Sequence, residues 1–264
     1  MITNFLNFVF LNKKIMKTKY LLILLFCNVY SFSQTEGDYK EDEVVHINVS
    51  QTQDILHGYP DYSDINERAI ECYNKATNIL YTDTNLAIKY YLEAIKIDPK
   101  FIQAYDNIAK TYRMLEEYDL SIKYYKKSID IFPNGDVAHG NLALVYKLQN
   151  KFEDAINEYK KVIEIQPNNP EGYYGIAGIL AFKVDELELA LINAKKALDI
   201  YINNPPNYIG DSYAQVGLIY YYLGNNAKAK TYIQIAKEKY IENNFEQVFK
   251  DTFPSSMLIE LSIE

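Results

Sequence analysis

Apolar residues recur through residues 64–241 at the three- and four-residue spacings that place them on one face of an α-helix. The clearest stretches are AIKYYLEAIKIDP, SIKYYKKSIDIFP and AINEYKKVIEIQP, which align with one another without gaps. Their prolines, Pro99, Pro133 and Pro167, lie 34 residues apart. Because proline cannot continue a helix interior, the pattern predicts helices that stop at regular intervals.

A second helical stripe precedes two of these stretches. AYDNIAKTY and AHGNLALVY are also 34 residues apart, so each repeating unit contains two helices. A single helix pair of this kind cannot bury its apolar face, and successive pairs must stack. The sequence therefore predicts an all-α array of about five helix pairs.

The unit resembles the tetratricopeptide repeat, which is about 34 residues long and has aromatic, small and proline residues at set places. The second unit carries this signature at Tyr105, Ile108, Ala109, Tyr112, Ser121, Tyr125 and Ser128. In the third unit His139 takes the first aromatic place, and the fourth and fifth units lack the aromatic residue of the second helix. The resemblance implies a right-handed superhelical α-solenoid, with units at residues 66–100, 101–134, 135–169, 170–207 and 208–241.

Capping signals and glycines add local detail. Three helix starts are predicted by residue pairs: Asp64 with Glu67, Asn150 with Glu153, and Asn169 with Pro170. Gly172, Gly175 and Gly178 follow the last of these starts, so they lie inside a helix. A phosphate-binding loop would instead follow a strand and precede a helix. Either the glycines allow neighbouring helices to pack closely, or they leave a flat floor for a partner backbone.

The segments that flank the repeats have separate expectations. Residues 34–63 form an acidic leader or linker, in which VVHINV is a short candidate strand without an obvious partner. In residues 242–264, Phe245, Val248 and Phe249 predict a helix that caps the last repeat. The apolar end, SSMLIELSIE, either folds back on the array or docks a partner.

The N-terminus has the order of a secretory signal. Four lysines precede an apolar run over residues 20–29, and Ser31 and Ser33 precede a cleavage site before Gln34. We therefore expect residues 1–33 to be a signal peptide, with Met1 or Met16 as the start, and an exported protein, either periplasmic or secreted. The alternative is an uncleaved membrane anchor facing the periplasm. The composition and the SFSQ end resemble those of exported proteins from Bacteroidota-type bacteria.

Charge and cysteine content narrow the possible partners. The formal charge is −8, and removal of the four signal lysines gives −8 − 4 = −12. Only two arginines occur, so we expect no nucleic acid partner, and the membrane only through an uncleaved N-terminus. After cleavage Cys72 would be the one cysteine, which excludes an internal disulfide and predicts a buried, inert thiol.

Catalytic and metal-binding patterns are not evident. The histidines are His46, His57 and His139, without metal-ligand spacing, and His139 is expected to be packed in the core. No triad motif occurs. We therefore predict a non-enzymatic protein without cofactor or metal.

In families that look like this one, the first helices line a concave groove that grips a peptide or protein segment. The register predicts groove positions at Asp106, Lys110, Arg113, Asn141, Leu144, Lys147, Tyr174, Gly178, Ala181, Phe182, Asp211, Leu218, Tyr221 and Tyr222. One half is basic and the other aromatic, so the expected ligand is an extended segment with an acidic end and an apolar or aromatic end. The alternative is that these residues are solvated lysines and packing tyrosines.

Overall fold

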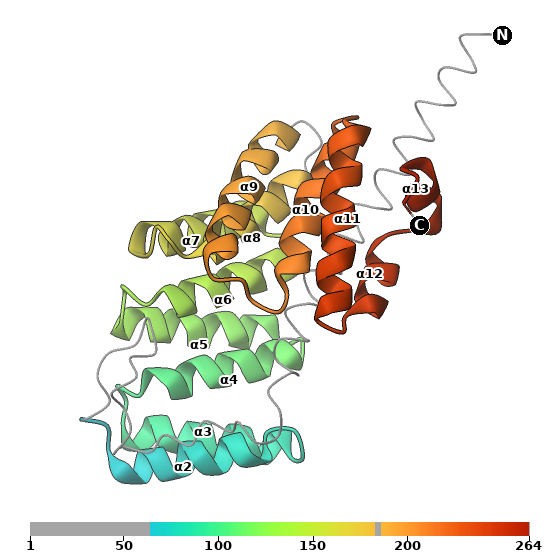
Figure 1. Cartoon of the computed structure of the whole chain (residues 1–264). Helices are drawn as coiled ribbons and strands as arrows, with labels where there is room; N and C mark the ends of the chain where they lie inside the picture. The colour runs from blue at the N-terminus through green and yellow to red at the C-terminus, as the bar shows by residue number, and fades with distance from the viewer. Residues whose placement is uncertain (1–63, 183–185, 264) are drawn as a thin grey trace, which may run out of the picture. The chain divides into compact units, whose positions relative to one another are not determined.

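The structure is a computed structural model that describes residues 64–182 and 186–263 (Figure 1). Within this part of the chain, regular structure is helical, and no strand is present. The helices are α2 (Glu67–Ile79), α3 (Thr84–Ile97), α4 (Ile102–Met114), α5 (Tyr118–Ile131), α6 (Asp136–Leu148), α7 (Phe152–Ile165), α8 (Pro170–Phe182), α9 (Leu187–Asn203), α10 (Ile209–Tyr222), α11 (Asn226–Glu242), α12 (Glu246–Thr252) and α13 (Ser255–Glu260). The predicted signal peptide, acidic leader and VVHINV strand lie outside the described residues.

The helices pack in consecutive pairs, α2 with α3 and so on to α10 with α11, and this confirms the predicted all-α repeat array. Figure 1 shows α2 to α6 following one another with each pair beside the next. The described residues form two compact units, one with α2 to α7 and one with α8 to α13. Among these helices, none is long and apolar enough to cross a membrane.

The first unit is held by small residues at the helix crossings and by large residues beside them. Ala76, Ala94 and Ala104 are fully buried, within one apolar cluster that spans α2, α3 and the start of α4. The ring of Tyr73 lies 5.0 Å from that of Phe101, so the first pair is joined to the second. Close helix approach and interlocking rings together provide the burial that a single pair lacks.

A second aromatic arrangement recurs in units far apart in the sequence. In the second helix pair the Tyr124 ring lies 6.5 Å from Tyr105 and stacks at 5.6 Å on Tyr112. In the fifth pair the corresponding three tyrosines repeat this geometry: Tyr232 lies 6.4 Å from Tyr213 and stacks at 5.5 Å on Tyr220. In each set, the tyrosine of the second helix, Tyr124 or Tyr232, thus contacts two tyrosine rings of the first helix.

One of the three predicted helix starts is confirmed and two are wrong. Asn169 Oδ1 accepts from the Glu171 amide at 2.9 Å, as expected before Pro170. The cap of α2 is Asn66 rather than Asp64, because Asn66 accepts from the amide of the second helical residue, Arg68. Asn150 has φ +58 and ends the turn after α6, since asparagine tolerates the left-handed region, so it does not cap α7.

The C-terminal segment, which is expected to contain a helix that caps the last repeat, packs its first helix against α11. Phe249 on α12 is buried, with its ring 6.1 Å from Tyr240 on α11. Of the two alternatives for the tail, the structure supports the fold back: the Tyr221 hydroxyl donates to Glu260 on α13 at 2.6 Å. Met257, Leu261 and Ile263 are buried in the same segment.

The remaining local expectations concern a thiol and three glycines. Cys72 has a free thiol and packs against the apolar cluster, but it is half-buried rather than buried. Gly172, Gly175 and Gly178 all lie inside α8, as predicted. The first two are buried and the third is half-buried.

Two helical glycines should respond oppositely to alanine. A Cβ on Gly217 would lie 2.7 Å from Ile233 Cγ1 and 3.2 Å from its backbone nitrogen, so Gly217→Ala overpacks the crossing of α10 and α11. We expect a loss of about 1–3 kcal/mol in the free energy of unfolding. A Cβ on Gly140 meets Val162 at an ordinary 3.7 Å, so Gly140→Ala should gain up to about 1 kcal/mol from helix propensity. Urea titration followed by circular dichroism measures both, and a shift in the same direction for both variants would contradict this packing.

Candidate functional site

The basic positions predicted to line a groove lie on α4 and α6, the first helices of adjacent pairs, which contact each other. Lys110 and Arg113 are half-buried on α4. Asn141 on α6 is also half-buried, and its side-chain amide donates to the Val137 carbonyl at 3.1 Å. Lys147 is only 5% exposed, so it is not one of the solvated lysines of the alternative interpretation.

The aromatic positions lie on α8 and α10 in the second compact unit. Tyr174 is half-buried, and its carbonyl accepts from the Gln215 side chain of α10 at 3.2 Å. Leu218 and Tyr222 are 2% and 5% exposed, while Tyr221 is half-buried and holds Glu260. Gly178 is half-buried on α8, and Phe182 is the last residue of that helix. The predicted basic positions therefore all belong to the first compact unit, and the predicted aromatic positions all belong to the second.

Buried Asp, His and Lys side chains in the described residues lie on first helices. Those in the described residues are Asp106 on α4, Asp136, His139 and Lys147 on α6, and Asp211 on α10. The second helices bury apolar side chains and, on α5, two serines. Burying a charge is costly unless it is paired, so these groups mark the first-helix faces as chemically distinct from the rest of the array.

Carboxylates and tyrosines meet in the second unit. Glu171 on α8 accepts from Tyr201 on α9 at 2.5 Å and from Tyr208, just before α10, at 3.5 Å. Asp211 on α10 accepts from the Tyr240 hydroxyl of α11. Burial raises the pKa of Tyr201 well above its ordinary value, and the negative charge of Glu171 raises it further. Tyr201 therefore remains a protonated donor at neutral pH.

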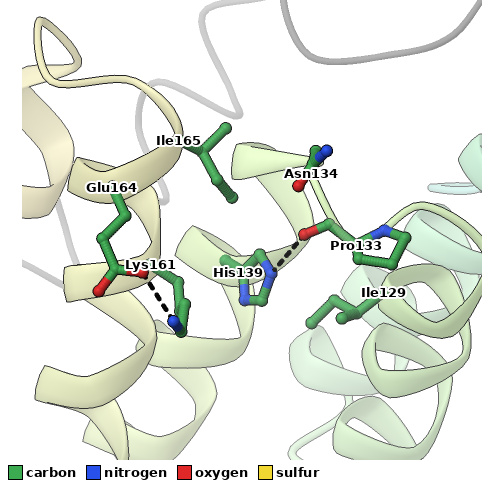
Figure 2. A pocket seen from close by; sticks show the side chains of 7 residues that line it. All are labelled: Ile129, Pro133, Asn134, His139, Lys161, Glu164 and Ile165. Atoms are coloured by element: carbon green, nitrogen blue, oxygen red, sulfur yellow. Dashed lines mark hydrogen bonds and ion pairs between the residues drawn. The ribbon is translucent and has the colours of Figure 1, made fainter.

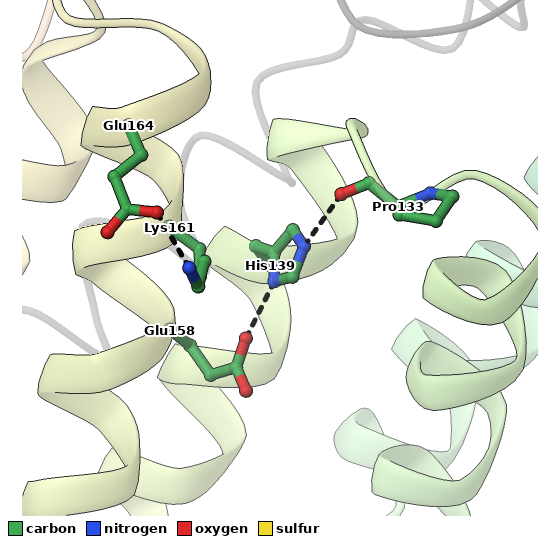
Figure 3. Close-up of polar contacts among 5 residues, drawn as sticks. All are labelled: Pro133, His139, Glu158, Lys161 and Glu164. Atoms are coloured by element: carbon green, nitrogen blue, oxygen red, sulfur yellow. Dashed lines mark hydrogen bonds and ion pairs between the residues drawn. The ribbon is translucent and has the colours of Figure 1, made fainter.

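The third helix pair contains a polar cluster that the sequence analysis did not predict. His139 is packed, as expected, but its Nδ1 lies 2.7 Å from Glu158 Oε2 on α7, and its Nε2 lies 3.1 Å from the Pro133 carbonyl (Figure 3). A cavity of about 650 Å³ lies beside the imidazole, lined by Ile129, Asn134, Lys161 and neighbouring residues (Figure 2). Aligning the units would have revealed the pair, because His139 and Glu158 have the same 19-residue spacing as the tyrosine pairs of the second and fifth units.

Metal chemistry has no evident site in residues 64–182 and 186–263. No three His, Cys, Asp or Glu side chains converge there as a metal ion would require. The cavity beside His139 offers one imidazole together with Lys161 and Glu164, which pair with each other at 2.6 Å. The arrangement is suited to polar and apolar contacts with another molecule.

Comparison with known proteins identifies the repeats. Tetratricopeptide repeat models match residues 82–101, 102–134 and 210–237, and a further model described as TPR repeat matches residues 145–181. These segments are tetratricopeptide repeats. No curated protein sequence matches the chain.

Solved structures share the fold at low sequence identity. A MamA protein matches with a TM-score of 0.56 at 20% identity, covering 67% of this chain and 94% of its own. MamA from Desulfovibrio magneticus RS-1 matches at 0.53 and 16%, covering 71% and 99%. A chain of the APC/C hetero-tetramer Cut9–Hcn1 matches at 0.58 and 14%, covering 76% and 40%. At these identities the likeness defines the fold class, a tetratricopeptide repeat array.

The two hydroxyls on Glu171 should differ in their contribution to stability. Tyr201→Phe removes a short, buried hydrogen bond to a carboxylate, and we expect a loss of about 1.5–3 kcal/mol in the free energy of unfolding. Tyr208→Phe removes a 3.5 Å contact to the same oxygen and should cost less than about 1 kcal/mol. Chemical denaturation of both variants tests the ranking, and equal losses would show that the 2.5 Å contact is not the stronger one.

Proposed function

We propose that this protein is a non-enzymatic interaction scaffold that binds a peptide or protein segment along the first-helix faces of its tetratricopeptide repeats. The observation that carries the proposal is that, in residues 64–182 and 186–263, the buried charged side chains lie on first helices. Asp106, Lys147 and Asp211 all fall on positions that the repeat register assigns to the groove. The second helices of the same pairs achieve their packing with alanine, isoleucine, tyrosine, valine and serine.

The energetics favour a recognition role for these groups. A solenoid needs only apolar and small residues at its crossings, so a buried charge adds a desolvation cost that its own partners must offset. A charge held in a partly desolvated place is a stronger and more selective contact for a ligand than a solvated one. Half-buried Lys110 and Arg113 lie next to this environment on α4 and provide the positive side chains for an acidic segment.

The kinds of assembly known for this fold support the proposal. The repeat-containing chain of the Cut9–Hcn1 complex forms part of a hetero-tetramer with another protein. For the present chain we infer an extended ligand with acidic residues for the α4 and α6 positions and apolar or aromatic residues for α8 and α10. Charge would direct the association, and the buried aromatic contacts would hold it.

The basic positions can be tested with a charge-matched pair of variants. Lys110→Glu with Arg113→Glu should lower the affinity of a bound partner at least about tenfold, because two attractive contacts become repulsive. Lys123→Glu with Lys127→Glu makes the same change in net charge on exposed positions of α5 and should leave binding unchanged. Photo-crosslinking from position 110 or 123 in the source cells, followed by mass spectrometry and titration of the captured protein, provides the measurement.

The control separates loss of recognition from loss of fold. Both variants must retain the parental circular dichroism spectrum and melting temperature. Equal binding by the α4 variant and the α5 variant would exclude the basic first-helix positions from recognition. A partner cross-linked from position 123 and not from position 110 would place recognition on the second helices instead.

We also propose that the mature scaffold is exported after cleavage of residues 1–33. The support is the order of lysines, apolar residues and small residues before Gln34. The competing proposal is an envelope assembly factor held at the membrane by the uncleaved segment. Intact-mass measurement of the protein from its source cells should give a chain that begins at Gln34 and is found in the soluble exported fraction. A chain that begins at Met1 or Met16 and sediments with membranes would establish the anchored form.

A further inference from the structure

The third helix pair differs from its neighbours at one repeated contact. In the second and fifth pairs, residues 19 positions apart form a ring pair, Tyr105 with Tyr124 and Tyr213 with Tyr232. In the third pair the same two places hold His139 and Glu158, whose Nδ1 and Oε2 atoms lie 2.7 Å apart, a contact that becomes an ion pair when the imidazole is protonated. An apolar contact that does not respond to pH is thus replaced by one that does.

The geometry around His139 selects one protonation state. Nδ1 faces a carboxylate oxygen and Nε2 faces the Pro133 carbonyl, and neither oxygen has a proton to donate. A neutral imidazole has one N–H and can satisfy only one of the two acceptors. Only the doubly protonated imidazolium donates to both, so it alone ties α6 both to α7 and to the linker from the second pair (Figure 3).

The charged groups around the ring have opposing effects. Burial lowers the pKa of His139, but the hydrogen bonds to Glu158 and to the Pro133 carbonyl raise it more, and the result is a raised pKa. Lys161 on α7 acts in the opposite direction, although it pairs with Glu164 at 2.6 Å. From α5, Lys126 lies 5.9 Å from the Tyr146 ring and interacts with Glu158. On α6 itself, buried Asp136 precedes His139 by one turn.

We propose that His139, Glu158 and the Pro133 carbonyl form a proton-operated clasp that holds the third helix pair closed and fixed to the second. When the ring loses a proton, one of its two acceptors loses its donor, and either the contact of α6 with α7 or its contact with the linker between α5 and α6 is lost. The cavity beside the imidazole gives the released ring room to turn and gives water access to it (Figure 2). Since α6 also carries Asn141 and Lys147, the clasp would control the shape of that first-helix face, a consequence that rests on the proposed function.

The direction of the pH dependence follows from linkage. Folding raises the pKa of the imidazole above the value of about 6.5 that it has in the unfolded chain. The contribution of the clasp to stability is therefore fully present below pH 6.5 and is lost as the pH rises through the folded-state pKa. Each unit of difference between the two pKa values is a tenfold change in the ratio of folded to unfolded protein.

The first test is the titration of His139 in the full chain by NMR with labelled histidine, the signal being assigned by its absence in His139→Gln. We expect a pKa above 6.5 in the parent and a lower value in Glu158→Gln, which keeps an acceptor but removes the charge. Hydrogen exchange in α6 and α7, corrected for intrinsic rates, should show weaker protection at pH 8.5 than at pH 6.0. A pKa at or below 6.5, or protection that does not change, would overturn the proposal.

The second test replaces the His139–Glu158 contact by the tyrosine ring pair found in the second and fifth helix pairs. The double variant H139Y/E158Y installs the ring pair of the second and fifth units, and the cavity supplies room for the larger ring. It should fold and lose the change in α6 and α7 protection between pH 6.0 and 8.5. If the double variant keeps the parental difference in α6 and α7 protection between pH 6.0 and 8.5, the proposal is wrong. If the double variant does not fold, the same comparison is made with Glu158→Gln. None of these readouts needs a partner, so they can fail independently of the binding experiments.

Discussion

The structure depends on the close approach of the two helices in each pair. Small side chains or glycine at the crossings make this possible: Ala109, Ala143 and Ala177 have no exposed surface, and at Gly217 even a methyl group would lie 2.7 Å from Ile233. The second helices also bury small side chains, among them Ser121, Ala155, Ala190 and Ala229. Because the backbones come close, the larger side chains are displaced to the flanks, where they reach the next pair.

The flanks are where the repeats differ in chemistry while sharing a backbone. In the second and fifth pairs, three tyrosines contact one another through their rings. The third pair places a histidine and a glutamate at the corresponding positions, and Lys126 lies over the remaining ring, that of Tyr146. The solenoid tolerates the exchange because each pair contacts only its neighbours, so a local change of contact type does not disturb distant units.

The sequence predicts the repeating part of this fold well and its exceptions less well. Prolines and periodic apolar residues locate the helix pairs because both signals are local and occur in several copies. The error at Asn150 arose because a polar residue between two helices can end the first or begin the second. Glu116, Asn150 and Gly224 all have positive φ at this place, so the geometry belongs to the repeat and not to asparagine. The burial of Lys147 and the partner of His139 depend on tertiary contacts that no local pattern encodes.

The same distinction explains where function can reside in such an array. Steric limits determine which residues fit at the helix crossings, and stacking on the next pair determines those on the flanks. The exposed faces of the first helices have neither constraint. The chain buries Asp106, Lys147 and Asp211 on these helices at the cost of desolvation, and Asp211 also accepts from the Tyr240 hydroxyl of α11. His139 extends this use of charge into the interior of the third pair, where its hydrogen bonds join three consecutive elements. In the part of the chain that the structure describes, buried Asp, Lys and His side chains are thus concentrated on the first helices, which the proposed function uses for recognition.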